Sequence, residues 1–123
     1  MPEKSIQQYV WDPDVEGALE QITDTFAHRI HPDQQTRVYK FHQDATDRIR
    51  AKCFERYHRN HDKMDEVLQI TRGSQLGHLI IESYQVCLEA WIDLGYLEDP
   101  SDLIQSWALN AMIATYGPHY HRA

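Results

Sequence analysis

The sequence predicts an all-α domain, a bundle of four or five helices. Apolar residues recur at every third or fourth position in several segments, which is the spacing of one face of an α-helix. Proline and glycine stand at the boundaries of these segments, where they start or end helices. No run of alternating β-branched residues indicates a strand. A length of 123 residues suits one domain, so we expect a single helical domain over 1–123, with an arm at 1–11 and a tail at 118–123.

The first predicted helix follows Asp12-Pro13, an N-cap residue and a proline at the first helical position. One apolar stripe then continues from Val15 to Ile30 at spacings of three and four residues. The His31-Pro32 pair ends this helix, because the residue before proline disfavours the α region.

The second predicted helical segment, 33–72, is long and charged. As one straight helix it would measure about 60 Å, whereas a globular chain of this length has a radius of gyration of about 14 Å. The apolar stripe also lapses between Phe54 and Met64. Either the helix breaks near Asn60, giving five helices, or it continues with its polar middle in solvent or along a partner.

Two apolar helices are expected near the C-terminus. The third helix, 76–94, follows the N-cap candidate Ser74 and ends at Gly95. Its polar positions form one narrow strip: His78, Glu82, Gln85, Glu89 and Asp93. The fourth helix, 103–116, starts after Asp99-Pro100 and carries no charged residue. Its apolar residues form two faces, so one face can join the core while the other needs a second part of this chain or another molecule.

Length, charge and cysteine content exclude several classes of protein. The formal net charge is −7, from 19 acidic and 12 basic residues. Cys53 and Cys87 form no CxxC pair, and the polar N-terminus has no signal-peptide core, so we expect reduced thiols and a cytoplasmic protein. The longest uncharged stretch is too short and too polar to span a membrane.

Eight histidines raise the question of a metal site. The best motif is Glu55 with His58, an ExxH pair of the kind found in helical di-iron sites, and His61 follows at helical distance. Such ligands must point into a core, but these three lie opposite the apolar stripe, and no second ExxH exists. They are weak metal candidates, and we expect no cofactor.

Enzymatic motifs are weak or absent. The sequence has no GxSxG and no glycine-rich phosphate loop. The Arg-x4–6-His spacing used by helical HEPN ribonucleases occurs three times, at Arg37/His42, Arg56/His61 and Arg72/His78. With eight histidines in this length such spacings arise by chance, so the sequence favours a non-enzymatic protein and leaves a HEPN-like enzyme as an alternative.

Charge is distributed unevenly along the chain. Residues 1–31 sum to −4, residues 32–72 to +2 and residues 73–123 to −5. Five basic residues of the middle segment share one helical flank at spacings of three and four: Arg48, Lys52, Arg56, Arg59 and Lys63. Pairing with neighbouring acids can explain this row, and docking of an acidic surface is the functional alternative.

These observations predict a non-enzymatic interaction or regulatory module, homodimeric, that docks an acidic or apolar protein surface. The predicted contact combines a basic, aromatic flank with an apolar anchor on the fourth helix. The flank is Arg48, Lys52, Arg56, Tyr57, Arg59 and Lys63, and the anchor is Leu109, Met112 and Ile113. Two alternatives remain: a small metal protein or enzyme using Glu55, His58 and His61, and an electrostatic nucleic-acid binder through Arg48–Lys63. The net charge disfavours nucleic acid, and no membrane partner is expected.

Overall fold

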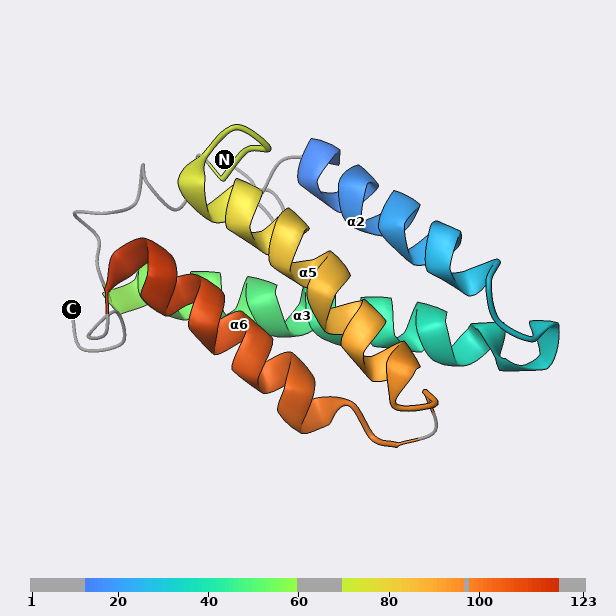
Figure 1. Cartoon of the computed structure of the whole chain (residues 1–123). Helices are drawn as coiled ribbons and strands as arrows, with labels where there is room; N and C mark the ends of the chain where they lie inside the picture. Colours follow the sequence, from blue (N-terminus) through green and yellow to red (C-terminus); the bar gives the residue numbers. More distant parts are fainter. Residues whose placement is uncertain (1–12, 60–69, 97, 118–123) are drawn as a thin grey trace, which may run out of the picture.

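The computed structural model describes residues 13–59, 70–96 and 98–117, except for the side chains of 56–59. In these ranges the chain is all-α, as predicted, with four α-helices and a short 3₁₀-helix (Figure 1). The elements are α2 (Pro13–Ala27), η1 (Pro32–Gln34), α3 (Gln35–Arg59), α5 (Gln75–Asp93) and α6 (Ser101–Tyr116). Among them there is no helix whose length and apolar content suit a membrane span. The predicted arm at 1–11 and tail at 118–123 lie outside the described residues.

The four α-helices pack so that each one lies closely against two others. Helix α2 packs on α3 and α5, and α6 packs on the same two helices. Figure 1 shows α2 and α5 running in one direction and α3 and α6 in the opposite direction. The chain therefore forms two helical hairpins, α2–α3 and α5–α6, that lie against each other.

The long second segment is not one helix. Helix α3 has 25 residues and ends at Arg59, and the chain from Ile70 to Ser74 is not helical. Ile70 is buried in the common core instead of continuing a helical stripe. A single helix over 33–72 is therefore wrong, because the chain must return to the core before α5 begins. Asn60, the predicted break, lies outside the described residues.

Side-chain hydrogen bonds organise the starts of α5 and α6. Ser74 caps α5, as predicted, and its Oγ accepts a hydrogen bond from the backbone N of Gly77 at 3.1 Å. Helix α6 begins at Ser101, so Pro100 is not its first helical residue. Asp99 still organises this start, because its carboxylate accepts hydrogen bonds from the N and Oγ of Ser101.

Aromatic rings fill the centre of the core. Phe41 of α3 stacks on Trp91 of α5, with ring centroids 5.0 Å apart and planes at 24°. Tyr84 is fully buried and meets Trp107 of α6 edge to face at 5.8 Å. Rings from α3, α5 and α6 thus meet in one cluster, which holds the two hairpins together.

Candidate interaction surface

The basic flank predicted on the second segment is only partly described. Arg48 is exposed, whereas the side chain of Lys52 is 9% exposed. Lys52 follows Ile49 and Ala45 around the helix toward the buried side, so most of its stem is covered. The predicted contact residues Arg56, Tyr57, Arg59 and Lys63 lie outside the described side chains.

Two adjoining clefts lie where α3 meets the start of α6. They measure about 370 and 410 Å³, and Asp44 and Ser101 line both. The other charged side chains in their walls have both signs: Arg37, Lys40, Asp47, Arg48, Glu98 and Asp99. Hydrogen bonds from the Oγ and N of Ser101 lower the pKa of the Asp99 carboxyl. Since both signs of charge surround the clefts, these walls select neither an anion nor a cation.

The side chains of the apolar anchor predicted on α6 are largely buried against other parts of this chain. Met112 is fully buried, and its sulfur lies 4.0 Å from the Cys53 sulfur of α3. Leu109 and Ile113 are half-buried and pack against the core. Trp107 on the other face of α6 meets α5. Met112 therefore offers no surface for another molecule, and Leu109 and Ile113 offer only part of their surface.

An uncharged surface remains on the outer side of α5 and α6. Ser83 accepts a hydrogen bond from Trp107 Nε1 at 2.8 Å, which fixes this flank of α5 beside α6. Helical geometry places three more α5 residues on the same flank and four α6 residues beside them. We call this set the α5–α6 face: Leu79, Ser83, Val86, Ala90, Leu103, Ser106, Asn110 and Ala114. None of these side chains is charged, and Val86 is 67% exposed.

An acidic strip borders the α5–α6 face. All five residues predicted for the polar strip of the third helix are exposed: His78, Glu82, Gln85, Glu89 and Asp93. His78 Nε2 lies 3.2 Å from the Glu82 carboxylate one turn away. Val86 follows Gln85 directly, so the apolar and acidic surfaces of α5 meet at this point. The sequence pattern showed the strip, but Val86 beside it was missed.

The described residues contain no grouping of three or more histidine, cysteine or acidic side chains suited to a metal ion. Glu55 is exposed, as the helical pattern predicted. The other two candidates, His58 and His61, lie outside the described residues, so the predicted set is not assembled in the part of the chain that is described.

The one Arg–His pair that lies wholly on α3 does not converge. Arg37 lines the cleft between α3 and α6, where its Nε donates to Gln34 Oε1 at 2.7 Å. His42 faces the other way, with its ring 6.2 Å from Tyr84 of α5. The Arg37/His42 spacing therefore forms no joint site.

His42 is the residue that the sequence did not single out as unusual. Among the described histidines it alone is not exposed. Its Nε2 is buried and has no hydrogen-bond partner, and burial lowers the pKa of its ring. Its neighbours in sequence, Gln43 and Asp44, are exposed, so local polarity gave no sign of its position.

A functional assignment rests on the fold and on the surfaces described above. No protein-family model, curated protein or solved structure matches the chain.

Proposed function

We propose that this chain is a non-enzymatic helical interaction module that acts as a homodimer through the α5–α6 face. The exposed Val86 is the observation that carries the proposal. Full burial of such a side chain is favourable by about 1.5–3 kcal/mol, and here the side chain is 67% exposed where the uncharged α5–α6 face meets the acidic strip. A surface of this kind gains free energy when another apolar surface covers it.

The distribution of charge limits where a second copy can dock to this uncharged face. The chain carries a net charge of −7, so two copies repel each other at long range. A contact centred on the α5 strip would bring Glu82 and Glu89 against the same carboxylates of the partner. In a two-fold contact the α5–α6 face would instead meet itself, with no charge at its centre.

The basic flank is proposed as a second contact, for an acidic surface of a protein partner. Arg48 is the exposed, described member of this flank. Lys52 is left out of this contact because its side chain is buried. Leu109 and Ile113, which are half-buried, can contribute only their outer edges.

Sedimentation equilibrium over a range of concentrations tests the homodimer. We expect the wild-type chain to associate and Val86→Glu to be a monomer, because the new carboxylate would be buried in the contact. Gln85→Glu is the matched control: it adds the same charge one residue away, on the exposed strip, and should still associate. A wild-type chain that stays monomeric, or equal weakening by both variants, would contradict the proposal. Circular dichroism checks that each variant is folded.

A further inference from the structure

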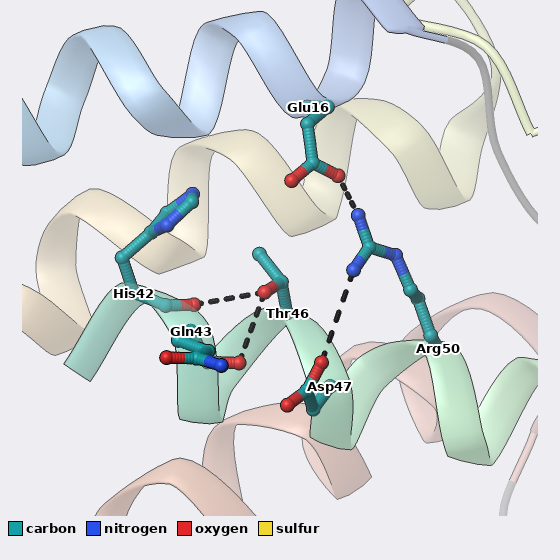
Figure 2. Close-up of polar contacts among 6 residues, drawn as sticks. All are labelled: Glu16, His42, Gln43, Thr46, Asp47 and Arg50. Atoms are coloured by element: carbon teal, nitrogen blue, oxygen red, sulfur yellow. Dashed lines mark hydrogen bonds and ion pairs between the residues drawn. The ribbon is translucent and has the colours of Figure 1, made fainter. Parts of the chain in front are cut away.

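Several polar contacts link α2 to α3 along the interface between them, which we call the α2–α3 joint. At one end, Gln35 Nε2 donates to the carbonyl of Ala27 at 3.1 Å. One helical turn further along α3, Tyr39 Oη donates to Asp24 Oδ1 at 2.8 Å. At the far end, Arg50 pairs with Glu16 (Figure 2). His42 lies between these residues on α3, and its buried Nε2 has no hydrogen-bond partner.

The hydroxyl of Tyr84, whose ring faces His42, is already used in a hydrogen bond. The Thr23 hydroxyl donates its one proton to the carbonyl of Leu19 at 2.7 Å. The 2.7 Å contact between the Thr23 and Tyr84 oxygens therefore has Tyr84 as the donor. Tyr84 presents its ring to His42, edge to face, with centroids 6.2 Å apart. Tyr84 therefore gives its proton to Thr23, and the buried Nε2 of His42 is left without a hydrogen-bond partner.

Three carboxylates face His42 without bonding to it. They are Glu20 and Asp24 of α2 and Asp47 of α3, and they favour the charged ring through space. All three are exposed, so water screens their effect. Burial is the larger influence and favours the neutral ring. Tyr84 is the titratable group that faces His42 from α5, and its burial raises the pKa of its hydroxyl, which keeps it neutral.

In the protonated ring of His42, the buried Nε2 carries a proton. A protonated imidazole has two N–H donors, and the Nε2 donor would be both charged and without an acceptor. That state is costly in an apolar site. Figure 2 shows the ring directed from α3 toward α2 and α5, so turning it outward to Glu20 requires the edge of the α2–α3 joint to open.

We propose that His42 is an acid-sensitive joint, in which protonation drives its ring outward toward Glu20 and releases α2 from α3 and α5. The proposal goes beyond self-association, because α2 is not part of the α5–α6 face. It assigns the chain a conformational response to mild acid that is independent of its oligomeric state.

The direction of the pH effect follows from the depressed pKa of His42 in the folded chain. Below the ordinary histidine pKa of about 6.5, the unfolded chain takes up a proton at this position before the folded chain does. The contribution of His42 to the free energy of unfolding is therefore fully present above about pH 6.5 and decreases as the pH falls below that value. Between pH 7.5 and 5.5 the unfolding equilibrium constant rises by up to about tenfold from this residue alone.

Urea unfolding of the full chain at these two pH values tests the stability effect. We expect His42→Gln to lack the contribution of His42 to this pH dependence. Between pH 7.5 and 5.5 its unfolding equilibrium constant should therefore rise by a factor that is up to about tenfold smaller than that of the wild type. His78→Gln, at an exposed histidine, is the matched control and should behave as the wild type does. Equal pH dependence in the wild type and in His42→Gln would overturn the proposal.

Two measurements on the wild-type chain locate the change and do not depend on the variant's folding. In an NMR titration, the His42 ring should titrate below the ordinary histidine pKa of about 6.5. Hydrogen exchange, corrected for intrinsic rates, should show the amides of α2 losing more protection on acidification than those of α6. Titration of His42 at or above that ordinary value, or a uniform loss of protection in all helices, would overturn the proposal.

Discussion

Gly77 of α5 lies directly against the carbonyl of Thr71: a Cβ atom added to Gly77 would be 1.8 Å from that oxygen. No side chain fits this space, because the obstructing group is backbone. The close approach lets Ser74 accept its hydrogen bond from the Gly77 N and also donate to the Thr71 carbonyl at 2.8 Å. The start of α5 therefore depends on the absence of a side chain at one position.

We expect Gly77→Ala to lower the free energy of unfolding by about 1–3 kcal/mol, since the backbone of Thr71 must move. Gly17→Ala is the matched control, because nothing lies within 4 Å of an added Cβ in the middle of α2. That variant should raise the free energy by about 0.5–1 kcal/mol through better helix propensity. Urea unfolding followed by circular dichroism measures both, and a stabilising Gly77→Ala would contradict the geometry.

Ser83 holds the indole of Trp107 between α5 and α6. Its hydroxyl donates to the Leu79 carbonyl, so its oxygen is free to accept from Trp107 Nε1 at 2.8 Å. Ser83→Ala leaves that buried N–H without an acceptor and should cost about 1–3 kcal/mol of unfolding free energy. Ser106→Ala, at an exposed serine of α6, should change it by less than about 0.5 kcal/mol. Tryptophan-detected unfolding compares them, and equal effects would argue against this hydrogen bond.

The Arg50–Glu16 pair joins α3 to α2 at the end of the joint opposite Gln35. The side chains of Arg50 and Glu16 are 10% and 27% exposed, and Asp47 lies 3.9 Å from Arg50 (Figure 2). Glu16→Gln should lower the unfolding free energy by about 1–3 kcal/mol, because the amide oxygen is a weaker acceptor and the charge of a mostly buried arginine loses its counter-charge. In a cycle with Arg50→Met, the double variant should lose less than the sum of the single variants.

Exposed carboxylates supply the control for this pair. Glu89→Gln, on the outer strip of α5, should leave stability nearly unchanged. Additive losses in the cycle would show that Glu16 and Arg50 stabilise the chain independently.

Cys87 should be an unreactive thiol that makes the chain sensitive to alkali. Burial raises the pKa of its thiol from 9.0 to about 11. Because the folded chain keeps this proton longer than the unfolded chain, stability is complete below about pH 9 and falls as the pH rises toward 11. At pH 8 the thiolate fraction is about a hundredfold below that of a free thiol.

A Cys53→Ala variant isolates Cys87 for this measurement. Its reaction with a disulfide reagent at pH 8 should be slow when folded and fast in urea. Reaction of the folded variant at the rate of free cysteine would show that Cys87 is accessible.

Local patterns predicted the helices better than they predicted which helix covers which face. The stripe from Val15 through Phe26 and the cap at Ser74 depend on neighbouring residues, and both were predicted correctly. The burial of Met112 was not, because periodicity shows that a helical face is apolar but not that α3 covers it.

Residues at the edges of apolar stripes were the hardest to predict. Lys52 was expected on a solvated flank, yet it is buried at the edge of the apolar stripe of α3. His42 lies at the opposite edge, where α2 and α5 meet. At such positions the burial of the side chain depends on how far the neighbouring helix extends over it. A single sequence does not show this.

The pairing of α2 with α3 and of α5 with α6 has a consequence for the integrity of the chain. Each hairpin is formed by helices that are adjacent in sequence. Noncovalent contacts, such as the stacking of Phe41 on Trp91, pack the two hairpins together. A chain cut within 60–69 therefore retains every described helix and both hairpins. We expect the two fragments, expressed separately, to find each other and reassemble, which would make the chain a candidate for split-protein complementation.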